Sequence, residues 1–186
     1  MPGPYYSGRG DDGTSTLFGN KERLTKDSAI FELLGSLDEL NCWIGVCRAQ
    51  SKRENKEEIA LLAPMLERIQ QSLFTIQAHV ASADKHLQQH DISALEADIL
   101  QLADSFEAPT SFCLPGGSLL SSQLDLARSV ARRCERYFIT ANRERLFPDS
   151  SLLSTYLNRL SSLLYVLVRY TNAQSGITET APHYGA

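Results

Sequence analysis

The sequence lacks the features that mark membrane and secreted proteins. Its longest apolar run near the C-terminus, 163–168, covers six residues, whereas a helix that crosses a bilayer needs roughly 18. The N-terminus has no positively charged stretch followed by an apolar one, which argues against a secretory signal peptide. The net charge is −4, and this lack of a basic excess argues against a nucleic-acid or anionic-membrane binder. We expect a cytoplasmic protein, or a mitochondrial matrix protein if a targeting segment has been removed.

Several catalytic and metal-binding signatures are missing as well. The four cysteines form no C-x-x-C pair and lie in apolar contexts, so we expect buried free thiols in a reducing compartment. The absence of Gly-Lys-Ser/Thr excludes a Walker A loop, and the absence of Glu-x-x-His sets aside a di-iron carboxylate bundle. His86 and His90 have metal-ligand spacing without an evident third ligand, so we expect surface histidines. No Ser/His/Asp or Cys/His constellation stands out.

What the chain does contain is helical periodicity. Its 186 residues, 42% hydrophobic and 22% charged, suit one globular domain with a substantial core. Helices are predicted over 28–51, 55–84, 93–106, 118–141 and about 150–174. Pro64 either kinks the second helix or lies in the first turn of its main part, and Ser93 with Glu96 predicts a capping box that opens the third.

These elements predict an all-α fold, because no segment alternates convincingly as a strand. Short connections favour antiparallel neighbours, and hence a five-helix up-and-down bundle. We assign the bundle to 26–175. A glycine-rich N-terminal loop, 1–25, precedes it, and a flexible C-terminal tail, 176–186, follows it.

The helix after Pro115-Gly116-Gly117 has two distinct faces, and Ser118 is its expected N-cap. Its apolar stripe comprises Leu120, Leu124, Ala127, Ala131, Cys134 and Phe138. Arg128, Arg132 and Glu135 form a second stripe, about a quarter turn away. Four arginines around one glutamate within 128–136 favour a polyanion site. The alternative is a solvated surface with helix-spaced ion pairs.

Three other features each have two interpretations. The stretch Ser7–Thr16 offers glycines and hydroxyls that can wrap phosphates, with Asp11 or Asp12 placed to hold Mg²⁺. The alternative is a mobile N-terminal segment. Phe112 is either a plug of the core or an aromatic side chain presented to a ligand. Asp38 is either simply exposed or part of an interhelical or intersubunit ion pair.

Along roughly 6–172 the chain resembles the PduO-type ATP:cob(I)alamin adenosyltransferases, or corrinoid adenosyltransferases. The resemblance lies in short blocks that follow one another in the family's order. They are Gly10-Asp11-Asp12-Gly13-Thr14, Lys26-Asp27, Leu37-Asp38-Glu39-Leu40-Asn41, Phe112-Cys113-Leu114-Pro115-Gly116-Gly117-Ser118, Ala127-Arg128, Arg132-Arg133-Cys134-Glu135-Arg136, Leu157-Asn158-Arg159-Leu160-Ser161 and Arg169-Tyr170-Thr171-Asn172.

The resemblance implies a homotrimer of ferritin-like helical bundles with active sites between subunits. It implies transfer of the 5′-deoxyadenosyl group of ATP to the cobalt of reduced cobalamin, cob(I)alamin. The products are adenosylcobalamin and triphosphate, and Mg²⁺ would be carried by the ATP phosphates. A reductase and an adenosylcobalamin-dependent acceptor enzyme are further implied partners.

Site residues are carried over by position. The resemblance implies a catalytic set in which Arg132 grips the polyphosphate, Glu135 orients the nucleotide and Phe112 caps the lower face of the corrin. Asp38 and Arg128 would pair across the subunit interface. The implied ATP-binding set is Ser7, Gly8, Arg9, Gly10, Ser15, Thr16, Lys26, Arg132, Arg133, Cys134, Glu135, Arg136 and Asn158.

The chemistry agrees with a site built from Arg and Lys. Cob(I)alamin is a strong nucleophile, so the protein must align the reactants and stabilise the leaving group, and it needs no general base. A hydrophobic residue that displaces the axial ligand would ease reduction to Co(I). The chain departs from the family at Ser7 and Gly8, where Thr and a basic residue are usual, and at Asp12, often Lys. A non-catalytic ATP- or cobalamin-binding carrier or sensor is therefore an alternative, and a purely structural bundle is a third.

Overall fold

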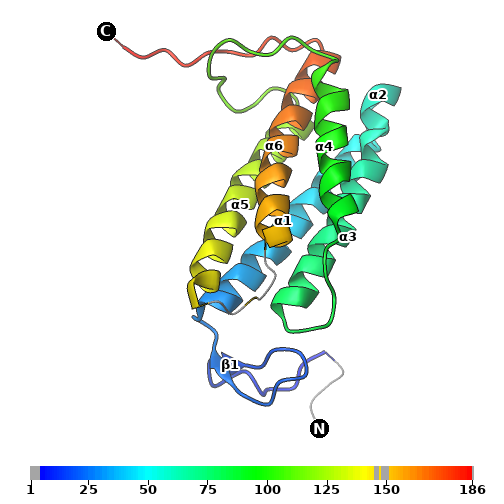
Figure 1. The fold of residues 1–186 in the computed structure, drawn as a ribbon. Helices are drawn as coiled ribbons and strands as arrows, with labels where there is room; N and C mark the ends of the chain where they lie inside the picture. Colours follow the sequence, from blue (N-terminus) through cyan, green and yellow to red (C-terminus); the bar gives the residue numbers. More distant parts are fainter. Residues whose placement is uncertain (1–4, 145–146, 148–150, 186) are drawn as a thin grey trace.

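A computed structural model describes residues 5–144, 147 and 151–185, and within them the fold is the predicted helical bundle (Figure 1). Five long helices account for most of the chain. They are α1 (Ala29–Ser51), α3 (Leu62–Val80), α4 (Gln89–Ala103), α5 (Leu119–Ala141) and α6 (Ser151–Gln174). A single-turn helix, α2 (Glu57–Ala60), precedes α3, and a 3-10 turn (Asn142–Glu144) follows α5.

The long helices pack around one apolar core. Helix α1 contacts α3 and α5, while α6 contacts α5 and α4. The predicted apolar stripe of α5 is confirmed, because all six of its residues are buried. Burial of such stripes is the main favourable contribution to folding, and here it orients every helix. The charged stripe of α5 consequently lies beside the core and faces outward.

The turn before α5 is built as the sequence predicts. The Ser118 hydroxyl accepts a hydrogen bond from the Ser121 N–H at 3.1 Å, so Ser118 is the N-cap of the helix. Gly116 and Gly117 have φ angles of +134° and +123°, a region that residues with a side chain rarely adopt. The chain can therefore turn sharply here and leave the preceding loop outside the bundle.

One local prediction, at Ser93, is wrong, and the structure selects one of the two interpretations of Pro64. Ser93 does not open α4; the helix begins at Gln89, and the Asp91 carboxylate accepts a hydrogen bond from the Gln88 N–H at 2.7 Å. Ser93 lies inside the helix and donates to the Gln89 carbonyl at 3.2 Å. Pro64 does not kink a long helix, because it lies in the first turn of α3, where its missing N–H is not needed.

The N-terminal segment also contains regular structure that the sequence analysis missed. Two-residue strands, β1 (Thr14–Ser15) and β2 (Leu24–Thr25), pair antiparallel. Strands this short carry no alternating pattern, so periodicity could not reveal them.

The two ends of the chain lie at opposite ends of the bundle (Figure 1). The β1–β2 ribbon lies below the start of α1, whereas the C-terminal segment runs beside the α4–α5 loop at the far end. Residues 177–185 have no regular secondary structure, but their first part is held: the Leu114 N–H donates to the Thr180 carbonyl at 2.8 Å. None of the helices in the described ranges is long and apolar enough to cross a membrane.

Candidate functional site

The charged face of α5 meets α6 through a short hydrogen-bonded chain. The Asn158 side-chain amide donates to Glu135 at 2.9 Å, and its oxygen accepts from Arg159 at 3.1 Å. Arg159 in turn pairs with Glu96 of α4 at 2.9 Å. The structure therefore brings together two predicted site residues that lie 23 positions apart, Glu135 and Asn158. Their orientation depends on helix packing and not on a flexible loop.

The arginines of α5 differ in what they bind. Arg133 forms an ion pair with Glu39 of α1, and Arg136 donates to the Arg132 carbonyl at 3.1 Å. The Arg132 guanidinium is exposed and has no carboxylate partner within the described part of the chain. It lines a shallow cavity of about 290 Å³ with Arg128, Ser161, Ser162, Tyr165 and Val166. Arg132 is thus a cation available to an anionic ligand.

Cys134, at the centre of the same segment, has a different role. Its side chain is fully buried in the core, and burial raises the pKa of its thiol to about 12. The side chain does not share the surface that Arg132 faces. The Cys134 side chain contributes packing, and the inclusion of Cys134 in the ATP-binding set stays a prediction.

The predicted phosphate-binding loop is compact in the structure. The Lys26 ammonium donates to the Gly10 carbonyl at 2.8 Å, which places it beside the glycine-rich turn. A Cβ on Gly10 would lie 3.0 Å from the Lys26 nitrogen, so only glycine leaves this contact undisturbed. Ser7, Gly8, Arg9, Ser15 and Thr16 belong to the same loop.

Arg23 organises this loop, and the sequence analysis did not single it out. Its guanidinium hydrogen-bonds the Arg9 carbonyl, the Thr14 hydroxyl at 2.6 Å and the Asp12 carboxylate at 3.1 Å. The pKa of Asp12 lies below its ordinary value, mainly because the carboxylate accepts hydrogen bonds from Thr14 and to a smaller extent because Arg23 is close. Asp12, an expected Mg²⁺ ligand, is thereby engaged within the loop. No spacing pattern links an arginine to a turn nine or more residues earlier.

The two parts of the predicted ATP site do not contact each other within one chain. No hydrogen bond or ion pair joins 5–26 to 132–136 in the ranges that the structure describes. A cavity of about 440 Å³ does open between α1 and α5, beside the Arg133–Glu39 pair. Its lining residues are Phe31, Glu32, Gly35, Ser36, Glu39, Arg133 and Tyr137.

Phe112 stands on the loop at the far end of the bundle. Its side chain is 81% exposed, which excludes the core-plug interpretation. It lines a cavity of about 450 Å³ together with Pro109, Thr110, Ser111, Tyr165, Ala181, Pro182 and Tyr184. An aromatic side chain with this exposure is available to a flat apolar ligand.

The predicted interface residues, Asp38 and Arg128, do not pair within one chain. Asp38 is exposed on α1. Arg128 pairs with Asp125 of its own helix at 2.9 Å. Their pairing across two subunits stays a prediction.

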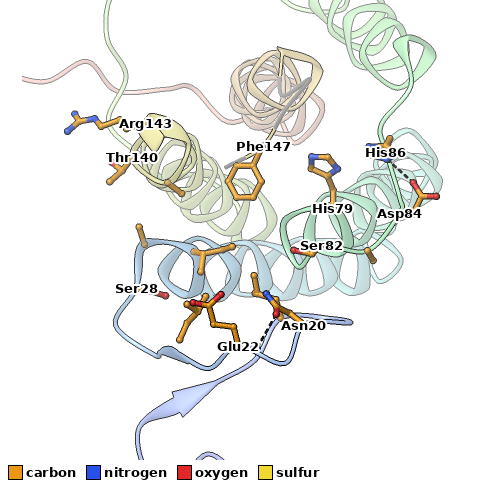
Figure 2. Close-up of a pocket in the computed structure, with 16 residues that line it drawn as sticks. Asn20, Glu22, Ser28, His79, Ser82, Asp84, His86, Thr140, Arg143 and Phe147 are labelled. Carbon is orange, nitrogen blue, oxygen red and sulfur yellow. Dashed lines mark hydrogen bonds and ion pairs between the residues drawn. The ribbon is translucent and has the colours of Figure 1, made fainter. Parts of the chain in front are cut away.

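A further cavity, of about 1010 Å³, separates the N-terminal segment from the end of the bundle (Figure 2). His79 and His86 approach edge to face in it, with ring centroids 4.8 Å apart, and Asp84 pairs with His86 at 3.0 Å. Burial, and then the charge of His86, lower the pKa of His79. No predicted site residue lines this cavity. The described residues contain no cluster of three or more His, Cys, Asp or Glu that could hold a metal ion.

The fold and these surfaces define a helical-bundle protein with an exposed cationic face and an aromatic cavity, and Tyr165 lines both. The model of the cobalamin adenosyltransferase family matches residues 5–171. The chain is 36% identical to a corrinoid adenosyltransferase of Citrobacter freundii, covering 95% of this chain and 96% of that protein. It is also 36% identical to one of Bacillus subtilis, covering 92% and 88%.

Other relatives are longer. The chain is 36% identical to the corrinoid adenosyltransferase PduO of Salmonella typhimurium over 88% of its own length, but it spans only 48% of that protein. Among solved structures, it matches a F112A variant of a PduO-type ATP:corrinoid adenosyltransferase from Lactobacillus reuteri complexed with cobalamin and ATP. The TM-score is 0.86 at 29% identity, with 97% of this chain and 99% of that chain covered. The chain belongs to the cobalamin adenosyltransferase family.

Proposed function

We propose that this chain transfers the 5′-deoxyadenosyl group of ATP to the cobalt of cob(I)alamin and releases triphosphate. The observation that carries the proposal is the family match over 5–171, together with an Arg132 guanidinium that has no carboxylate partner among the described residues. In the transfer, the electron pair of Co(I) forms the bond to C5′ of the ribose. The C5′–O bond breaks, and its electron pair leaves with the triphosphate.

The protein's contribution to this step is alignment and charge stabilisation. Arg132 would neutralise part of the charge on the departing triphosphate, and Lys26 and the 7–16 loop would bind its other phosphate groups. The Glu135–Asn158 pair, joined at 2.9 Å, would orient the nucleoside. We propose that Mg²⁺ arrives with the ATP phosphates, because the described residues offer no acidic cluster for it.

Phe112 is proposed to act on the cobalamin. Placed under the corrin ring, its phenyl group would displace the lower axial ligand, and loss of a donor makes Co(II) easier to reduce. Its 81% exposure and the neighbouring cavity support this assignment. A separate reductase and an acceptor enzyme for adenosylcobalamin remain proposed partners.

We also propose that the enzyme is a homotrimer with its sites between subunits. The phosphate-binding loop and the loop that carries Phe112 lie at opposite ends of one bundle (Figure 1). Helix α5 alone, with 23 residues, is about 35 Å long at 1.5 Å per residue. Because C5′ and cobalt must come into bonding contact, one subunit would supply the phosphate-binding loop and its neighbour the Phe112 loop. Asp38 and Arg128 are proposed to pair across that interface.

The compartment is proposed from two observations. The curated relatives described above come from bacteria, and all four cysteines are free thiols. Both favour a reducing cytoplasm.

The decisive experiment mixes the protein with ATP, Mg²⁺ and chemically reduced cobalamin and follows the corrin absorbance. We expect a light-sensitive adenosylated product with the wild-type chain. Arg132→Ala should lower kcat about 10²- to 10³-fold, as loss of one charge-stabilising donor typically does. It should not change the melting temperature. Arg53→Ala, which removes another exposed arginine, should leave activity unchanged.

The alternatives give different results. A carrier or sensor would bind ATP and cobalamin tightly without forming product. A purely structural bundle would bind neither ligand in calorimetry. Either outcome for the wild-type chain would reject the proposed transferase.

A further inference from the structure

A buried arginine on α6 depends on the C-terminal tail for its counter-charge. Arg169 is 4% exposed, and its guanidinium pairs with Glu179 of the tail at 2.8 Å. The other nearby carboxylate, Asp125, is 3.9 Å away and already pairs with Arg128 at 2.9 Å. A buried charge without a partner is strongly unfavourable. Glu179 therefore holds the tail against the bundle.

Asn172 connects this ion pair to the loop that carries Phe112. Its side chain is 1% exposed, and its amide nitrogen lies 2.7 Å from the Glu179 carboxylate and 3.1 Å from the Gly116 carbonyl. One residue beyond Glu179, the Thr180 carbonyl accepts from the Leu114 N–H at 2.8 Å. The loop is thus held at Leu114 and at Gly116, two and four residues after Phe112.

The loop has little else to hold it in place. Among the described residues, three hydrogen bonds join the backbone of residues 106–117 to the rest of the chain, and the Cys113 thiol also interacts with Glu179 and Arg169. Two of the three backbone bonds are those made by Asn172 and Thr180, and the third is a 3.4 Å contact from the Ser121 hydroxyl to the Gly116 carbonyl. Glu179 bonds to Asn172 and directly precedes Thr180. Loss of its carboxylate would therefore weaken both of the first two hydrogen bonds.

We infer that Glu179 is a positioning residue for Phe112: its carboxylate clamps the C-terminal tail onto the 112–117 loop and so sets where the phenyl group stands. The inference rests on the proposed function for its catalytic consequence. The clamp itself is a property of the protein without ligands. Ala181, Pro182 and Tyr184, just beyond the clamp, then face Phe112 across the 450 Å³ cavity.

The first test is amide hydrogen exchange of the ligand-free protein. Glu179→Ala removes the carboxylate, and Glu179→Gln keeps its shape but removes its charge. We expect exchange at Leu114 to accelerate about tenfold or more, because hydrogen bonds to a charged group are stronger than those between neutral groups. Exchange within α5 should stay unchanged. Glu107→Gln is the matched control, because it also neutralises one carboxylate, here an exposed one in the α4–α5 loop that contains Leu114.

The second test separates positioning from general structural damage. In Glu179→Gln we expect the KM for cob(II)alamin to rise about tenfold in the coupled reduction assay while the KM for ATP stays unchanged. The rate with preformed cob(I)alamin should change less. If Glu179→Ala does not fold, Glu179→Gln carries both tests.

The inference is overturned if Leu114 exchanges at the wild-type rate in both variants. It is equally overturned if the two KM values rise together, since that would indicate a general loss of structure. A wild-type chain that forms no adenosylcobalamin would instead reject the proposed function. Even then, the exchange experiment decides whether Glu179 clamps the loop.

Discussion

Two phenylalanines show that position in the fold decides what a residue can do. Phe138 recurs in the apolar stripe of α5 and is buried, where it contributes to stability. Phe112 lies outside any helix and is 81% exposed, so it contributes little to the core. Its proposed role is in the chemistry of the corrin, where an exposed apolar ring can replace a ligand of cobalt.

Replacing Phe112 should therefore separate reduction from alkyl transfer. We expect Phe112→Ala to slow product formation from cob(II)alamin and a reductant by about 10²-fold or more, because an axial ligand tunes the metal's potential. The reaction of preformed cob(I)alamin should be affected much less, and the melting temperature should hardly change. Phe74→Ala, which removes another exposed phenyl group on α3, serves as the control. Equal losses with both cobalt states would contradict the role.

At the same scale, the sequence predicted side chains on helices far better than those in loops. Glu135 and Asn158 were included in the site through the family resemblance, and because both lie on helices they meet at 2.9 Å. Arg23 and Glu179 organise the two irregular segments, yet neither was predicted. Their contacts join positions seven or more residues apart through turns, and irregular backbone has no period from which such contacts can be inferred.

The helices themselves were predictable because burial and periodicity agree. The bounds expected for α1 and α6, 28–51 and about 150–174, match Ala29–Ser51 and Ser151–Gln174 closely. At the start of α4, tertiary contacts overrode the local capping signal. Ser93 and Glu96 resemble a capping box, but Glu96 pairs with Arg159 of α6 at 2.9 Å, and the helix starts earlier.

The turn before α5 offers a matched pair of substitutions at the level of the element. Gly116 and Gly117 both have positive φ, so alanine at either position costs about 1–3 kcal/mol of backbone strain. A Cβ on Gly116 would meet no atom within 4 Å, whereas one on Gly117 would lie 2.2 Å from the Asn172 oxygen. Only Gly117→Ala must displace Asn172.

We therefore expect Gly117→Ala to lose about 3 kcal/mol more stability than Gly116→Ala, because it also breaks the hydrogen bonds of a buried amide. Urea unfolding followed by circular dichroism measures both variants. Equal destabilisation would mean that Asn172 moves without cost and does not hold the loop.

A single chain does not bring its two proposed ligand-binding regions together. The N-terminal loop that is proposed to bind phosphate and the loop between α4 and α5 lie at opposite ends of the bundle (Figure 1), and Asp38 has no partner on its own α5. The proposed second subunit would account for both observations. An exposed strip on α1 supports this arrangement, since Asp38, Cys42 and Val46 recur every four residues and therefore share one face.

Cys42 can report on that interface through its reactivity. Cys47 and Cys134 are fully buried and their thiols have pKa values of about 12, so at pH 8 only about one in 10⁴ is a thiolate, the reactive form. They serve as internal standards that should label only on unfolding. Cys42 is exposed in the single chain. If the proposed trimer forms and Asp38 lies at its subunit interface, the assembly should protect Cys42, one helical turn away.

Asp38→Arg should then place a positive charge opposite Arg128 and dissociate the proposed trimer. A thiol reagent should label Cys42 at least tenfold faster in this variant than in the wild-type protein. Light scattering gives the mass, and mass spectrometry locates the label. Glu57→Arg, an exposed charge reversal on α2, should remain trimeric with Cys42 protected. Rapid labelling of Cys42 in a wild-type trimer would place the interface on another face of the bundle, and the proposed pairing of Asp38 with Arg128 would fail with it.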